Sequence, residues 1–176
     1  MKVERSRAAR STPTLDGERG ISPQSLGDTA MSNMYVVIQH QNGRVGHQSI
    51  GQALVEADLD ASLTTLALRR KREPLVSFTV YSSKQAAEAI QELEELEDVD
   101  VDPRDFDAKW FDPVDCIATV DSLLESRARC VAKGVRTELA LLRRVLTEVA
   151  HRGSTFHLVE VESEEEIGCE KILLRE

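Results

Sequence analysis

Aromatic residues are scarce in this chain, where Phe, Trp and Tyr together make up 4% of 176 residues. A core must therefore be built mainly from Leu, Val, Ile and Ala, which favours helices packed on a sheet and not a surface that stacks on nucleobases. No apolar run approaches the roughly 18 residues that a membrane-spanning helix needs. The basic N-terminus is not followed by the apolar segment of a secretion signal. These absences predict a cytoplasmic protein without a membrane segment.

The cysteines are few and have no metal-binding spacing. Cys116, Cys130 and Cys169 are an odd number without a C-x-x-C pair, which indicates neither a disulfide framework nor a zinc knuckle and predicts reduced thiols. The chain also lacks a glycine-rich phosphate loop, a dinucleotide fingerprint and a G-x-S-x-G motif. We therefore expect no cofactor and no metal, and assign no catalytic residue.

Acidic residues are abundant and unevenly spread. The formal net charge is −9, and the acids crowd residues 88–107 and 160–166. Such surfaces repel phosphate, so nucleic-acid binding is not expected. They are typical either of a protein that binds a basic protein partner or of a solvated face that keeps a small protein soluble.

The chain divides into a tail and one domain. Residues 1–33 mix Arg, Ser, Pro and Gly without apolar periodicity, which predicts a disordered tail with a basic tip. Whether Met31 or Met34 is the biological start stays open. The whole chain is 41% hydrophobic and 30% charged, and residues 34–176 have the length of a single domain.

Three strong strand signals and two weaker ones are present. Residues 35–40 predict a buried strand that turns at Asn42-Gly43, a two-residue hairpin pair, into a polar edge strand at residues 44–50. Residues 75–81, LVSFTVY, predict the central strand. Residues 155–161 predict another strand, with His157 on the same face as Val159, and residues 169–174 a last short one.

Helical periodicity marks four further segments, at residues 61–70, 84–97, 113–127 and 135–152. Asp58 and Asp60 are candidate caps of the first, Ser82 or Ser83 of the second, and Gly153 suits the end of the last. The pattern predicts an α+β domain in which three to four helices cover one face of a small mixed or antiparallel sheet.

The most informative stretch is KWFDPVD, which contains the candidate binding residues Trp110, Phe111, Asp112 and Asp115. Asp112 before Pro113 predicts a helix N-cap, and Asp115 adds a carboxylate in the first turn, with Val114 facing inward. The alternative is a carboxylate pair that performs acid and base chemistry or holds a divalent metal. Trp110 and Phe111 fit either a docking anchor or a core plug.

The histidines show no metal-binding helical spacing. His40 and His47 could meet across the hairpin, whereas His157 is expected to be a packed, hydrogen-bonded residue. Cys116 lies in a helix first turn, which can activate a thiol, but Asp112 and Asp115 beside it favour a packed, inert one.

Three segments resemble an uncharacterised family of small bacterial proteins. They are EPLVSF at residues 73–78, KWFDPVDCIATVDSLL at residues 109–124 and STFHLVEV at residues 154–161. The resemblance covers roughly residues 35–161. It implies a bacterial intracellular α+β domain and carries no activity, cofactor or site residue with it.

The leading functional hypothesis is a non-catalytic acidic interaction or regulatory protein of the inhibitor or immunity type, whose partner is another, basic protein. The alternatives are a small metal-assisted hydrolase that uses Asp112 and Asp115, and a structural subunit of a larger assembly. The partner, the process and the oligomeric state stay open.

Overall fold

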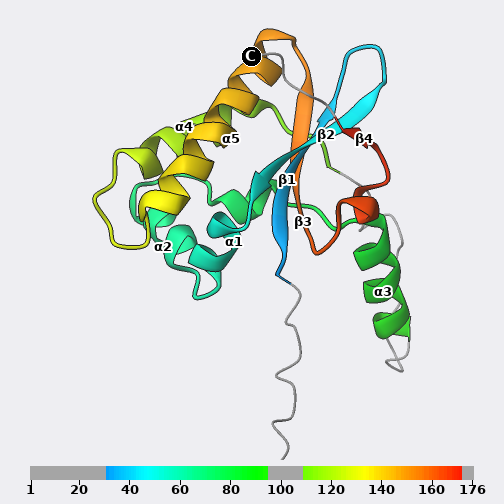
Figure 1. The fold of residues 1–176 in the computed structure, drawn as a ribbon, viewed down its shortest axis with the longest axis horizontal. Helices are drawn as coiled ribbons and strands as arrows, with labels where there is room; N and C mark the ends of the chain where they lie inside the picture. The colour runs from blue at the N-terminus through cyan, green and yellow to red at the C-terminus, as the bar shows by residue number, and fades with distance from the viewer. Residues whose placement is uncertain (1–30, 95–108, 172–176) are drawn as a thin grey trace, which may run out of the picture.

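The computed structural model describes residues 31–94 and 109–171, and the predicted tail lies almost wholly outside these ranges. The fold is α+β, as the sequence predicts, with helices on a four-stranded mixed sheet in the order β3-β1-β2-β4 (Figure 1). Within the two described ranges, no helix is both long and apolar enough to cross a membrane.

The sheet is antiparallel except at one edge. β1 (Asn33–Gln39) pairs antiparallel with both β2 (Val45–Gly51) and β3 (Thr155–Val161). The two residues of β4 (Glu170–Lys171) pair parallel with β2. β2 therefore lies between two strands and not at the edge as predicted. Of the expected last strand, residues 172–174 lie outside the described ranges.

The hairpin turn differs from the two-residue turn expected at Asn42-Gly43. The His40 amide donates to the Arg44 carbonyl at 2.8 Å and the Gly43 amide to the His40 carbonyl at 2.9 Å. Residues 41–43 form a three-residue loop, and within this loop only Gly43 has a positive φ, +78°. One left-handed residue after an ordinary turn is the usual chemistry of such a loop.

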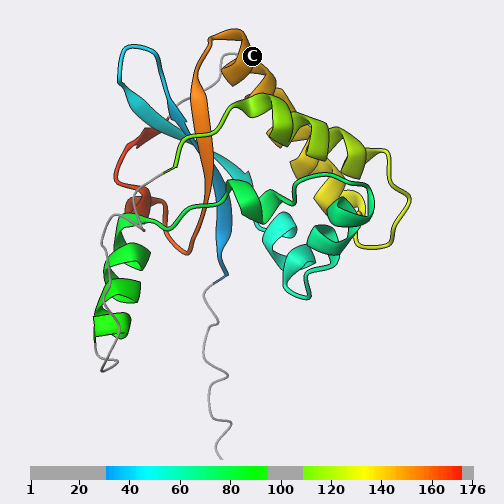
Figure 2. The same ribbon diagram turned by 180° about the vertical axis from the view of Figure 1, so that it is seen from behind.

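Four helices cover one face of the sheet, at the left in Figure 1 and at the right in Figure 2: α1 (Ala53–Asp58), α2 (Ser62–Arg69), α4 (Pro113–Leu124) and α5 (Lys133–His151). The main core lies between these helices and the sheet. Its fully buried members include Val36, Ile38, Leu123, Leu139, Leu142, Leu146, Phe156 and Leu158.

Residues 75–81 were expected to be the central strand, and this prediction is wrong. Leu75–Phe78 forms a 3-10 turn, η1, and only Thr79 makes a strand-like bridge, to Leu158. Leu75 and Phe78 are buried, three residues apart, while Val76 between them is 58% exposed. Burial at every third residue fits the three-residue period of a 3-10 helix, whereas a strand would alternate.

α1 was not predicted, because its stability depends on a distant residue. The Glu138 carboxylate of α5 accepts hydrogen bonds from the backbone amides of Ala53 and Leu54, at 3.0 and 2.8 Å. This carboxylate satisfies free amides at the start of a six-residue helix. Gly51 makes the contact possible, since it has φ +137° and a Cβ there would collide with Glu138 Oε1.

α2 begins close to the predicted boundary but with different capping. Its N-cap is Ala61, with φ +57°. The two predicted caps nevertheless bind amides near the helix start, because Asp60 accepts from Ser62 N at 3.1 Å and Asp58 from Thr64 N at 2.9 Å.

α3 (Ser83–Glu94) lies on the opposite side of the sheet from the other helices, beside η3 (Glu164–Ile167) (Figure 1, Figure 2). The predicted cap Ser82 forms a reciprocal capping box with Gln85, at 3.2 and 2.9 Å. Gln85 also donates to the Glu160 carbonyl of β3 at 2.8 Å. Residues 95–97 of the predicted helix lie outside the described ranges.

Candidate functional site

The predicted binding residues Trp110, Phe111, Asp112 and Asp115 lie close in sequence but serve different parts of the structure. Phe111 pairs with Phe156 of β3 through two backbone hydrogen bonds and packs in the main core. Trp110, one residue earlier in extended chain, therefore lies on the opposite face of the sheet.

Asp112 is the N-cap of α4, and its Oδ1 accepts from the Val114 amide at 2.8 Å. Asp115 is exposed in the first turn of the helix. Val114, which was expected to face inward, is 61% exposed, whereas Leu123 in the last turn of the helix is fully buried. Within residues 31–94 and 109–171, no three His, Cys, Asp or Glu side chains lie close enough together to hold a metal ion.

A row that contains both inward-facing histidines crosses the sheet on the face opposite the main core. The strand register places His157 of β3, Val37 of β1, His47 of β2 and Lys171 of β4 side by side. Directly opposed residues share a face. A second, smaller core surrounds the row, with Tyr35, Val159 and Val161 buried in it and with Val80, Trp110, Ile167 and Cys169 packed over it.

His157 is 5% exposed and stacks on Trp110, with ring centroids 4.4 Å apart. Burial lowers the pKa of His157 from 6.5 to about 4, and a hydrogen bond with the Lys109 backbone opposes this shift. Nδ1 is the one buried side-chain nitrogen or oxygen in the described residues without a hydrogen-bond partner. A neutral ring that uses Nε2 as donor to the backbone has an acceptor lone pair at Nδ1.

His47 is 2% exposed and contacts two reactive side chains. Its Nε2 lies 2.8 Å from Glu164 Oε1, and its Nδ1 lies 3.5 Å from Cys169 Sγ. The hydrogen bond with His47 lowers the pKa of the Glu164 carboxyl, with a smaller contribution from Lys171 at 3.5 Å. Burial raises the pKa of the Cys169 thiol.

A cavity of about 260 Å³, which we call the histidine cavity, is lined by His157 and by Cys169, the residue that His47 contacts. Its wall combines aromatic, apolar and polar side chains, an arrangement typical of sites for small molecules. The lining includes Tyr81, Ser82, Trp110, His157, Ile167 and Cys169.

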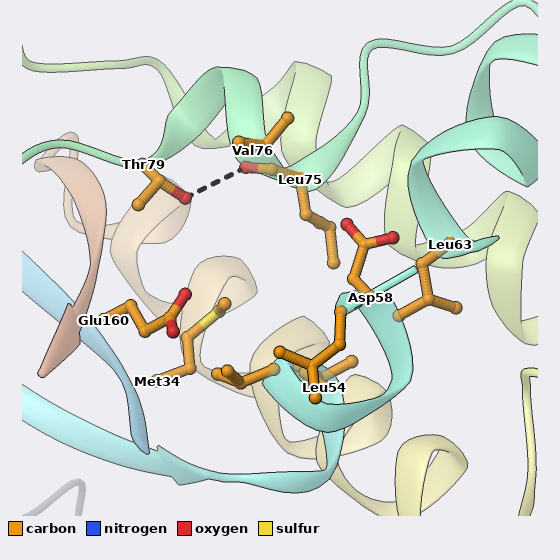
Figure 3. Close-up of a pocket in the computed structure, with 10 residues that line it drawn as sticks. Met34, Leu54, Asp58, Leu63, Leu75, Val76, Thr79 and Glu160 are labelled. Carbon is orange, nitrogen blue, oxygen red and sulfur yellow. Dashed lines mark hydrogen bonds between the residues drawn. The ribbon is translucent and has the colours of Figure 1, made fainter. Parts of the chain in front are cut away.

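A second hollow, of about 190 Å³, lies between α1, η1 and the sheet (Figure 3). Leu54, Leu63 and Leu75 form much of its wall, and Asp58 is one of its two carboxylates. Asp58 binds Thr64 through both of its oxygens, at 2.9 and 2.7 Å. That carboxylate is thus committed to the start of α2, and the hollow offers fewer converging polar groups than the histidine cavity.

The two acidic runs of the sequence meet at one end of the molecule. α3 carries Glu88 and Glu92 at exposed positions. η3 contributes Glu165, and Glu162 lies two residues before η3. α3 and η3 lie side by side in both views (Figure 1, Figure 2), and Lys84 and Glu166 join them across 3.6 Å. We call Glu88, Glu92, Glu162 and Glu165 the acidic surface. The acids at residues 95–107 lie outside the described ranges.

Sequence reasoning missed the contact of His47 with Glu164 and Cys169. The predicted pair of His40 and His47 does not form, because His47 lies opposite Val37 and His40 instead approaches Ser154 Oγ at 3.4 Å. The alternation of strand residues did place His157 beside Val159. The available signal was that each histidine alternates onto an inward-facing position of its own strand. Placing the two in one row requires knowing that β2 and β3 both flank β1.

No family model, curated protein or solved structure matches this chain.

Proposed function

We propose that this protein is a non-catalytic interaction protein, of the inhibitor or immunity type, that binds a basic protein partner through the acidic surface. The observation that supports the proposal is the convergence of α3 and η3, which gathers acids more than 70 residues apart in sequence, from Glu88 to Glu162. A concentrated field of one sign steers an oppositely charged partner and raises its association rate.

The acidic surface is not needed for packing. The side chains of Glu88, Glu92, Glu162 and Glu165 are exposed, and the main core lies on the other side of the sheet. Exposed acids on neighbouring elements add little to folding stability, so the acidic surface is free to serve recognition.

We also propose that the protein is cytoplasmic. All three cysteines are free thiols, which fits a reducing compartment. We also propose that the segments at residues 73–78, 109–124 and 154–161 relate the chain to the bacterial family that they resemble.

The test is quantitative affinity capture from the native cell at low salt, with the full chain as bait. The variant combines Glu88→Gln, Glu92→Gln, Glu162→Gln and Glu165→Gln. We expect it to lose a basic protein that the wild type retains, and we expect salt to weaken the wild-type complex because exposed charge pairs are screened.

The matched control removes four exposed acids from the helical side: Glu56→Gln, Glu73→Gln, Asp115→Asn and Glu125→Gln. It changes the net charge by the same amount and should retain the partner. Equal loss of binding in both variants would mean that net charge alone is responsible, and unchanged binding in the first would refute the proposal.

A further inference from the structure

We infer that Cys169 is a nucleophilic thiol that exchanges with small disulfides, with His47 as its general base and Glu164 as the positioning residue of that base. The inference is independent of partner binding at the acidic surface. It rests on the contacts of His47 with Glu164 and Cys169 and on the cavity that Cys169 lines.

The three cysteines have different surroundings. Cys116 is fully buried in α4, where burial strongly raises the pKa of its thiol. Cys130 and Cys169 are both partly exposed. Cys169 lines the cavity, and its Sγ lies 3.5 Å from Nδ1 of His47.

Glu164 determines which nitrogen of His47 accepts a proton. Its lowered pKa keeps the carboxyl ionised, and an ionised carboxylate only accepts hydrogen bonds. Nε2 of His47, at 2.8 Å, must therefore carry a proton. In the neutral ring Nδ1 is then the acceptor, and it faces the Cys169 thiol. An acid, a histidine and a nucleophile in this order form the arrangement by which enzymes activate serine and cysteine.

Burial opposes a permanently formed thiolate at Cys169, since it raises the pKa of this thiol. Proton removal during attack avoids that cost, because the proton passes to His47 as the new bond forms. The groups that face His47 are Glu164 from η3, Cys169 and Lys171 from the C-terminal segment, and Tyr35 from β1.

The exchange is balanced in atoms and electrons. His47 Nδ1 accepts the thiol proton while the Cys169 sulfur bonds to one sulfur of the disulfide. The disulfide bond breaks, its electron pair leaves on the other sulfur, and that sulfur takes the proton from His47. One thiol and one disulfide yield one mixed disulfide and one thiol, so no other oxidant is required.

The cavity indicates the kind of disulfide. Trp110 and Tyr81 offer aromatic surface at the cavity wall. The nearby acids Glu162, Glu164 and Glu165 disfavour an anionic reagent. A small, uncharged disulfide with a flat aromatic group suits this environment best.

The experiment uses dithiodipyridine, a small uncharged aromatic disulfide, on the full chain. Pyridinethione release gives the rate, and peptide mass spectrometry assigns it to Cys130 or Cys169. The test variant is Glu164→Gln, and the control is Glu170→Gln, which removes the same charge at the exposed residue next to Cys169. We expect Glu164→Gln to slow the modification of Cys169 at least about tenfold, because the neutral amide no longer fixes the proton on His47 Nε2, and the corresponding change in the Ser-His-Asp triad costs about 10⁴-fold.

The pH profile separates base assistance from a structural effect. An unassisted thiol loses about tenfold in rate per pH unit below its pKa. The modification rate of Cys169 in the wild type should fall by less than tenfold per pH unit between about pH 8 and pH 6. The rates of Cys130 in the same sample and of Cys169 in Glu164→Gln should fall by the full tenfold per unit. Equal rates in Glu164→Gln and Glu170→Gln, or a full slope for wild-type Cys169, would overturn the inference.

Discussion

Three consecutive residues show how position on the sheet decides the role of a side chain. Trp110 covers the small core and stacks on His157, Phe111 enters the main core, and Asp112 caps α4. The residues were candidates for one binding site because they are adjacent in sequence. Extended backbone sends neighbouring side chains to opposite faces, so only Trp110 borders the histidine cavity.

His157 predicts a specific pH dependence of stability. Burial lowers its pKa in the folded state to about 4, below the ordinary value of 6.5. The unfolded chain binds more protons between these values. The stability is therefore complete above about pH 6.5 and is lost as pH falls towards 4. After allowance for solvent screening, we expect a contribution of about 1–2 kcal/mol to the loss between about pH 7 and pH 5.

The measurement is urea unfolding of the wild type and of His157→Gln at both pH values. Gln can still donate to the Lys109 carbonyl but does not titrate, so the variant should lose less stability on acidification. His151→Gln, at an exposed position, is the control and should behave as the wild type. Parallel losses in all three proteins would contradict the assignment.

At the scale of elements, η1 shows where local propensity fails. Residues 75–81 are rich in β-branched and aromatic residues, which favours a strand. The segment instead forms a 3-10 turn, because Phe78 packs against Phe111 and Phe156. The ring centroids of these two pairs lie 5.5 and 6.0 Å apart. The N-cap of α4 and the extent of α5 were predictable because their signals lie within one helix.

Leu75 and Val76 distinguish the turn from a strand. Leu75→Ala should lower the free energy of unfolding by about 2–5 kcal/mol, since Leu75 is buried. Val76→Ala should change it by no more than about 0.5 kcal/mol, because this side chain lies in solvent. Urea denaturation measures both. A strand would bury Val76 on the same face as Phe78, so a large cost at Val76 would disprove the turn.

At the scale of the whole molecule, β1 joins two cores. Val36 and Ile38 face the four helices, whereas Tyr35 and Val37 face the small core that contains the histidines. β3 and β2 supply hydrogen bonds on either side. The cavity, the Cys169 contact and the acidic surface all lie on the side of the smaller core, which leaves the larger one to stabilise the fold.

This arrangement predicts the order of hydrogen exchange. Residues 34–38 of β1 are all buried, whereas no described side chain of α3, at residues 84–92, is buried. Amides in β1 should therefore exchange slowest, and amides in α3 much earlier. Peptide-resolved exchange monitored by mass spectrometry tests the order. Equal protection of α3 and β1 would show that α3 is part of the cooperative core.

The sequence by itself determined the features that depend on near neighbours. These are the α+β class, the strand at residues 155–161, the Asp112 cap and a serine cap at Ser82 or Ser83, since each arises from residues a few positions apart. Only the tertiary structure decided which distant residues meet. Glu138 reaches α1 across 85 positions, and His47 contacts Glu164 and Cys169 across more than 100. Such contacts depend on sheet order and register, which local patterns do not encode.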